Sequence, residues 1–184
     1  ALKELKKARN FQTEKRRALT VQEQELFEKF LGRQGQYHRW YPIFTIMLWT
    51  GMRVGEITGL TWEDVVIDEQ SIATNNARVI INKELSRVNA QAMQKLKEKD
   101  IIKIFPTQKP HCTTRLVLKT PKTETSNRTV WLPTTLAQLL VQYKKDQQEL
   151  KEFLGSAYND YNLVIALENG NPVEIRIVRV RFTT

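Results

Sequence analysis

One apolar stretch, YPIFTIMLWT at residues 41–50, constrains the fold more than any other part of the sequence. It is hydrophobic on every face of a helix, which is typical of a helix buried in a core. Pro42 is compatible with a first helical turn and Gly51 is a stop signal, so we expect one buried helix here. The segment RVGEITG then predicts a short second helix that ends near Gly59. The apolar stretch is too short to span a bilayer, and we expect a folded domain.

Capping and periodicity predict two further helices and a domain boundary. Residues 1–17 mix charged and amide side chains and are interpreted as a basic lead-in, whereas residues 18–184 are expected to form the domain. Thr20 and Glu23 have the spacing of a capping box at the start of a helix. The segment TTLAQLLVQYKKDQQELKEFLG, at residues 134–155, has leucines at helical spacing and a terminal glycine, which predicts a long helix.

Short runs of β-branched residues predict a small sheet. Such runs occur at residues 71–74 (SIAT) and 77–82 (ARVIIN). Residues 115–119 and 128–132 flank a connection rich in Pro, Thr, Ser and Asn, and this arrangement predicts a β-hairpin.

Two segments are less regular. Residues 83–113 contain a charged helical pattern within the strand series, and we interpret them as an insertion within the sheet region. At residues 173–184 the alternation of apolar and charged residues favours a strand, but a short helix after Pro172 stays open.

The basic composition favours a polyanionic partner. Lysine and arginine number 29 against 20 acidic residues, which gives a formal net charge of +9. Nucleic acid is the first candidate, because phosphate contacts release counterions and supply much of the affinity; a solvated lysine surface is the alternative. The single Cys112 cannot form an internal disulfide, and the first residues have no apolar signal segment. The cytoplasm is therefore the expected location.

Arg53 follows the buried helix and has two interpretations. It could pair with Glu56 three residues later in a weak surface interaction. It could instead bind a phosphate, because a guanidinium contacts two oxygens at once and stays charged at any relevant pH. A rigid buried helix behind Arg53 would make it a preorganised phosphate ligand.

Lys122 lies in the turn of the predicted hairpin, where a solvated lysine is the default. A hairpin tip could instead place this ammonium beside a DNA phosphate, where it would donate a proton to a leaving alkoxide. Such a role contributes roughly two to four orders of magnitude in rate.

The order of three features resembles the catalytic domain of tyrosine recombinases, specifically integrases of phages and conjugative transposons. The features are the stretch TGMRVGEITGLTWEDV, a strand series, and then KTPKTETSNRTVWLP. The segments RRALTVQEQELFEKFL and LENGNPV also resemble parts of that domain, so the resemblance extends from about residue 16 onward. It implies that Arg53 is the first catalytic arginine and Lys122 the catalytic lysine. Glu56 is expected to orient the arginine.

The resemblance implies a mainly α fold with a small antiparallel β-sheet, of which this chain is a partial, truncated form. It also implies DNA strand cleavage and rejoining through a phosphotyrosyl intermediate, without a metal or other cofactor. The expected partner is double-stranded DNA at a core recombination site, bound by a tetramer in a protein of bacterial or phage origin. Residues expected to contact DNA are Lys119, Arg128, Arg16 and Arg17.

The sequence departs from the family pattern downstream. The family has a His-x-x-Arg motif and a nucleophilic tyrosine near the end of the domain, and neither is found here. His111 and Arg115 are one residue too far apart and precede Lys122, and His38 is too early. All of the tyrosines precede LENGNP: Tyr37, Tyr41, Tyr143, Tyr158 and Tyr161. We therefore predict no nucleophile in this chain and no DNA cleavage by it alone.

Other functions remain as alternatives. One is a catalytically inactive DNA-binding or regulatory remnant of an integrase, and another is a basic domain that binds proteins. A metal site is not expected, because His111 and Cys112 have no spaced partners. The glycines of GMRVGEITG lack the spacing of a phosphate loop, so no nucleotide site is expected either.

Overall fold

The computed structural model describes residues 17–32, 40–95, 100–107, 112–121 and 126–178. It divides the chain into two compact units, Ala1–His38 and Arg39–Thr184. The division expected between residues 17 and 18 stays a prediction about the domain organisation. Among the described helices, none is both long enough and apolar enough to cross a membrane.

The first unit contains helix α2 (Val21–Leu31), which begins at the predicted capping box. The backbone N–H of Glu23 donates to the Thr20 hydroxyl (3.3 Å), and the N–H of Thr20 donates to the Glu23 carboxylate (2.9 Å). These two bonds satisfy donors that the first helical turn would otherwise leave unpaired. The predicted start of the helix is confirmed.

The second unit is built around the predicted apolar helix, α3 (Tyr41–Thr50). It ends at Gly51, whose φ of 62° is left-handed. Helix α4 (Val54–Thr58) follows at once and ends at Gly59, as predicted. The long predicted helix is α7 (Thr134–Leu154), which packs against α3. Buried apolar side chains that include Ile43, Phe44, Ile46, Leu136 and Leu140 form this part of the core.

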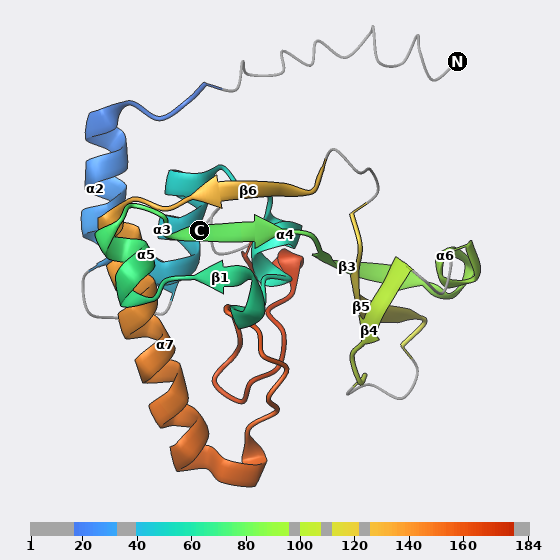
Figure 1. The fold of residues 1–184 in the computed structure, drawn as a ribbon. Coiled ribbons are helices and arrows are strands. Elements are labelled where there is room, and N and C mark those ends of the chain that lie inside the picture. Colours follow the sequence, from blue (N-terminus) through green and yellow to red (C-terminus); the bar gives the residue numbers. More distant parts are fainter. Residues whose placement is uncertain (1–16, 33–39, 96–99, 108–111, 122–125, 179–184) are drawn as a thin grey trace, which may run out of the picture. The chain divides into compact units, whose positions relative to one another are not determined.

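The strands form two small antiparallel sheets (Figure 1). The first has the order β1 (Val65–Val66), β2 (Arg78–Ile81), β6 (Arg128–Trp131). The second has the order β3 (Glu84–Asn89), β5 (Thr114–Lys119), β4 (Ile101–Ile104). The unit also contains short helical elements: η2 (Trp62–Asp64), α5 (Glu69–Ala73), α6 (Ala90–Lys95) and η5 (Gly155–Ala157).

The predicted hairpin is wrong. Strand β5 pairs with β3 and β4, whereas β6 pairs with β2, so the two expected arms belong to different sheets. The pairing is non-local: Val79 lies opposite Val130, and Ser86 lies opposite Val117. Figure 1 shows the second sheet beyond the end of β2, with α6 at its far side. Residues 83–113, interpreted as an insertion, thus supply two strands of a sheet.

The prediction of strand at residues 71–74 is also wrong, because this segment belongs largely to α5. The Asp68 carboxylate accepts from the backbone N–H of Ser71 (2.8 Å) and caps the helix. Near the C-terminus, residues 175–178 are helical, which settles the alternative that the sequence left open for this part of 173–184.

The segment around Leu163 and Val164 connects several elements of the second unit. The backbone N–H of Val164 donates to the Leu60 carbonyl (2.9 Å), and that of Trp62 donates to the Asn162 carbonyl (3.0 Å). The Gln147 side-chain amide on α7 donates to the Leu163 carbonyl (3.2 Å). Leu163 also belongs to a buried cluster with side chains of the second sheet and its flanks: Leu85, Phe105, Leu116 and Leu118.

Candidate functional site

The Glu56 carboxylate, on helix α4, is the centre of the candidate site. Its side chain is only 3% exposed, and each of its two oxygens accepts hydrogen bonds from two arginines. A buried carboxylate needs such partners, because burial without them would cost several kcal/mol of solvation free energy. The partners are Arg53, three residues earlier, and Arg128, on β6.

Arg53 is the N-cap residue of α4, with an extended backbone (φ −69°, ψ 150°). Its backbone N–H donates to Glu56 Oε2 (2.9 Å), and its side-chain Nη1 donates to Glu56 Oε1 (3.1 Å). The side chain is nevertheless 74% exposed. The residue is therefore fixed at its base and reaches solvent with a charged group that can bind a ligand.

Arg128 is held more tightly than Arg53. It donates from Nη1 to Glu56 Oε1 (2.9 Å) and from Nη2 to Glu56 Oε2 (2.7 Å), and its side chain is 34% exposed. Two parallel bonds of this kind are the strong, directional form of an arginine–carboxylate pair. Nη1 also lies 3.4 Å from the Ser126 carbonyl.

The electrostatics keep Glu56 ionised. Burial raises the pKa of its carboxyl group. The hydrogen bonds and charge of Arg128, with the backbone N–H of Arg53, lower this pKa by more than burial raises it, so the net pKa is below the ordinary value. Two guanidiniums and one carboxylate then give the cluster a net charge of +1, from +2 and −1. This cluster attracts an anion, and the exposed Arg53 is the group best placed to meet one.

The other residues predicted to contact DNA have acidic partners of their own or lie outside the described residues. The Lys119 ammonium pairs with Glu84 across β3 and β5. Arg17 donates two hydrogen bonds to Glu23, which with the bonds from Thr20 lower the pKa of Glu23 to about 2. Arg16 and Lys122, and likewise His38 and His111, lie outside the residues that the structure describes.

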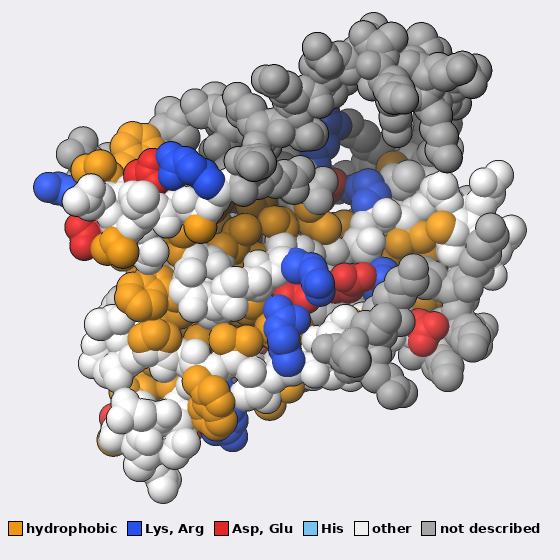
Figure 2. Space-filling model, turned by 90° about the horizontal axis from the view of Figure 1, so that it is seen from above, with side chains coloured by type: hydrophobic (Ala, Val, Ile, Leu, Met, Phe, Trp, Pro, Cys, Tyr) orange, Lys and Arg blue, Asp and Glu red, His pale blue; other side chains and the backbone are white. Residues whose placement is uncertain are grey.

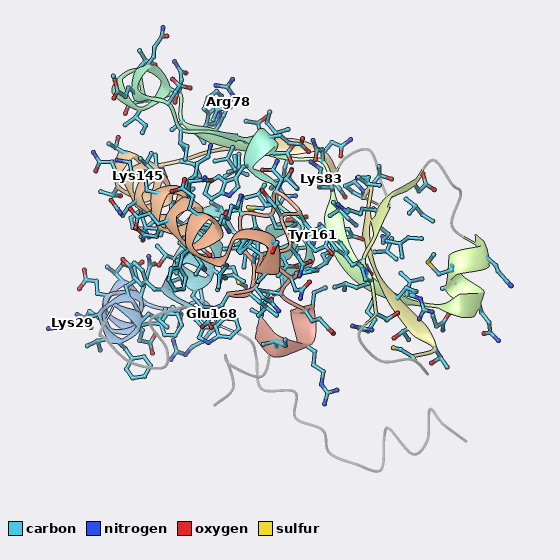
Figure 3. The ribbon with its side chains drawn as sticks, turned by 90° about the horizontal axis from the view of Figure 1, so that it is seen from below. Lys29, Arg78, Lys83, Lys145, Tyr161 and Glu168 are labelled. Carbon is cyan, nitrogen blue, oxygen red and sulfur yellow. The ribbon has the colours of Figure 1, made fainter. Side chains whose placement is uncertain are left out.

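A second ionic cluster, which the sequence analysis missed, surrounds the buried Lys83. Its ammonium donates to the Thr61 hydroxyl (2.9 Å), to Glu63 (3.0 Å) and to the buried Asp64. Lys83 lies between β2 and β3, where the chain passes from one sheet to the other (Figure 3). The surrounding NKE sequence resembles an exposed polar turn, so no local signal predicts this burial.

Two of the tyrosines in the described part of the chain have poorly ionisable hydroxyls. Burial, with smaller contributions from Tyr158 and Asp146, raises the pKa of Tyr143 to about 12. Burial and the nearby Asp160 also raise the pKa of Tyr158. Burial thus disfavours ionisation of both hydroxyls.

Positive and negative side chains adjoin one another on the surface of the second unit. Figure 2 shows Lys and Arg side chains next to Asp and Glu side chains near the middle of the face seen from above. Arg128, Lys119 and Arg87 each form an ion pair with a glutamate. The charge of each of these cations is offset by its glutamate. Arg53 differs from them because its side chain is more exposed.

Comparisons with known proteins found one similar sequence and several similar structures. The sequence is 29% identical over 140 residues to a protein named "Tyrosine recombinase XerC-like" from Caldanaerobacter subterraneus subsp. tengcongensis, and the match covers 74% of this chain and 30% of that protein. No family model matches the sequence.

Solved structures of the Tn1549 transposon integrase share the fold. The structure in complex with transposon right-end DNA has a TM-score of 0.60 at 18% identity, and covers 92% of this chain and 44% of that one. A structure in complex with a circular intermediate DNA has a TM-score of 0.61 at 16% identity, and covers 97% and 49%. The predicted fold class, mainly α with small antiparallel sheets, is confirmed. The chain spans less than half of these solved chains and under a third of the curated relative.

Proposed function

We propose that this chain is part of a site-specific recombinase of the tyrosine recombinase, or phage-integrase, type, and that it binds duplex DNA with Arg53 on a backbone phosphate. The solved relatives are integrases in complex with DNA, which supports the same partner here. In the whole protein the partner would be a core recombination site, bound by a tetramer. Residues 18–184 would be part of the catalytic domain and residues 1–17 a basic lead-in.

The proposed reaction is strand cleavage and rejoining without a cofactor. A tyrosine hydroxyl attacks a DNA phosphodiester, a 3′-phosphotyrosyl bond forms, and the 5′-oxygen leaves as a hydroxyl. Arg53 would stabilise the negative charge on the nonbridging oxygens of the transition state. Lys122 would donate the proton to the leaving oxygen, and its position lies outside the described residues. None of the tyrosines in this chain is proposed as the nucleophile, so the chain alone should not cleave DNA.

One observation carries the proposal: Arg53 is anchored at its backbone and one Nη by Glu56, while its side chain is 74% exposed. Preorganisation of this kind is what a phosphate ligand needs, because the group is held in place before the charge develops. Lys119 would contact the DNA backbone only if its ammonium left Glu84 and bound a phosphate instead. Arg16 and Arg17 are proposed as further backbone contacts from the lead-in.

The test is a binding titration of this chain with a fluorescent duplex of about 30 base pairs, roughly three helical turns, at several salt concentrations. We expect the affinity to fall steeply as salt rises, and Arg53→Ala to reduce the slope of log K against log salt by about 1. Lys145→Ala is the control, because Lys145 is an exposed lysine on α7 and its loss removes the same formal charge. Equal effects of the two substitutions, or binding that does not respond to salt, would contradict the proposal.

A further inference from the structure

We propose that Arg128 is a positioning residue, whose guanidinium holds the Glu56 carboxylate in the one orientation in which that carboxylate fixes Arg53. This inference rests on the proposed function, in which Arg53 contacts a DNA phosphate. It replaces the sequence-based expectation that Arg128 itself contacts DNA. The candidate site would then contain one arginine that contacts the phosphate, Arg53, and one that contacts the supporting carboxylate, Arg128.

The hydrogen bonds define the orientation of the carboxylate. Oε1 accepts from Nη1 of both Arg128 (2.9 Å) and Arg53 (3.1 Å). Oε2 accepts from Nη2 of Arg128 (2.7 Å) and from the backbone N–H of Arg53 (2.9 Å). Because the two bonds from Arg128 are parallel, they fix the plane of the carboxylate as well as its position. A rotation of Glu56 would weaken its bonds to both arginines.

The two arginines differ in how much of each is available to a ligand. The Arg128 side chain is 34% exposed and both of its Nη atoms are bonded to Glu56, whereas the Arg53 side chain is 74% exposed and uses one Nη. If Arg128 turned toward a phosphate, it would leave a buried carboxylate without its strongest partner. The geometry therefore favours a supporting role for Arg128.

The ion pair also joins parts of the fold that are far apart in sequence. Arg128 and Glu56 are 72 residues apart, and they connect the start of β6 to helix α4. Strand β6 is held by β2, and α4 packs on β3. The placement of Arg53 therefore depends on both sheets, and Arg128 is the residue through which β6 contributes.

A double-substitution experiment separates this role from direct contact with DNA. We would measure duplex affinity for Arg128→Lys in the wild-type chain and in the Arg53→Ala chain. Lysine keeps the charge but cannot form two parallel bonds to a carboxylate. We expect a loss of about threefold to tenfold in the wild-type background and about twofold or less in the Arg53→Ala background, because the two residues act through one contact. Equal losses in both backgrounds would show direct contact and overturn the proposal.

Arg78→Lys is the matched control. Arg78 lies on β2, with its guanidinium over the Trp131 ring (5.6 Å), and it donates a hydrogen bond to the Asn76 carbonyl (3.0 Å) and not to Glu56. Whatever effect this substitution has on DNA affinity, it should be the same with and without Arg53.

A second readout does not require DNA. Nuclear magnetic resonance of the chain would follow the Glu56 carboxyl group through a pH titration, and the hydrogen exchange of the Arg53 backbone N–H. Arg128→Lys should raise the pKa of Glu56 toward its ordinary value of 4.5 and speed the exchange of this N–H, while Arg78→Lys should change neither. If the wild-type chain binds no DNA, the proposed function fails, but this measurement still decides the role of Arg128: unchanged Glu56 and Arg53 signals would overturn it.

Discussion

At the scale of single residues, Lys83 shows how a buried charge fixes a junction in the backbone. Its ammonium and the Asp64 carboxylate are both buried, and Asn82 donates to the other oxygen of Asp64 (2.8 Å). The consecutive residues 82 and 83 thus hold the same carboxylate at the point where β2 ends and β3 begins. The attraction within such a pair is largely offset by the cost of removing two charges from water. The pair therefore specifies a geometry more than it adds net stability.

Removal of one partner should be costly. We predict that Lys83→Met lowers the free energy of unfolding by about 3 kcal/mol, because it leaves the Asp64 charge buried without its cation. Lys145→Met, at an exposed position on α7, should change it by about 0.5 kcal/mol or less. Urea unfolding measures both. The double variant Lys83→Met with Asp64→Leu should recover part of the loss, and a double variant that loses as much as the sum of its singles would argue against a buried pair.

At the scale of elements, helix α4 is seated directly on strand β3 by its terminal glycine. A Cβ atom on Gly59 would lie 2.7 Å from the Leu85 backbone nitrogen and 2.9 Å from the Glu84 carbonyl carbon. Its φ of −96° is accessible to any residue, so the requirement for glycine is one of space. Gly51 is the opposite case, with a left-handed φ of 62° and open space around its Cβ position.

This contrast predicts a ranking of two substitutions. Gly59→Ala should destabilise the chain by about 2–3 kcal/mol, because the helix and the strand must separate to admit the methyl group. Gly51→Ala should cost about 1 kcal/mol, which is the strain of a left-handed alanine. Thermal unfolding of the two variants tests the ranking. If Gly51→Ala proved the more harmful, α4 would not be packed on β3 as described.

The same elements show what a sequence reveals and what it does not. Helices α2, α3, α4 and α7 could be predicted because caps, glycines and apolar spacing are local signals. The pairing of β5 and β6 with their true partners could not be predicted, because strand partners are chosen by contacts between segments distant in sequence. The site divides in the same way: Arg53 and Glu56 are three residues apart and could be paired by inspection, whereas Arg128 joins them from 72 residues away.

At the scale of the whole second unit, its two sheets are expected to unfold together. The buried Lys83 cluster holds the backbone between them, and the side chains of the second sheet share a core with Leu163, which also bridges to Thr61. The Gln147 side chain accepts from the Trp62 indole (2.6 Å) and so ties the same region to α7. Contacts of this kind pass through all parts of the unit, which is the condition for a single cooperative transition.

The positions of the tryptophans make this testable. All four of them, Trp40, Trp49, Trp62 and Trp131, lie outside residues 84–119, so fluorescence reports on the unit without the second sheet, while far-ultraviolet circular dichroism reports on both. We predict that Val117→Ala, at a fully buried position on β5, lowers stability by about 2 kcal/mol and shifts both signals to the same urea midpoint. Ile102→Ala, at a 49% exposed position on β4, is the matched control and should shift both midpoints by under about 1 kcal/mol. The prediction would fail if the dichroism midpoint fell while the fluorescence midpoint stayed at the wild-type value. The second sheet would then unfold independently, and the Lys83 junction would not couple it to the rest of the second unit.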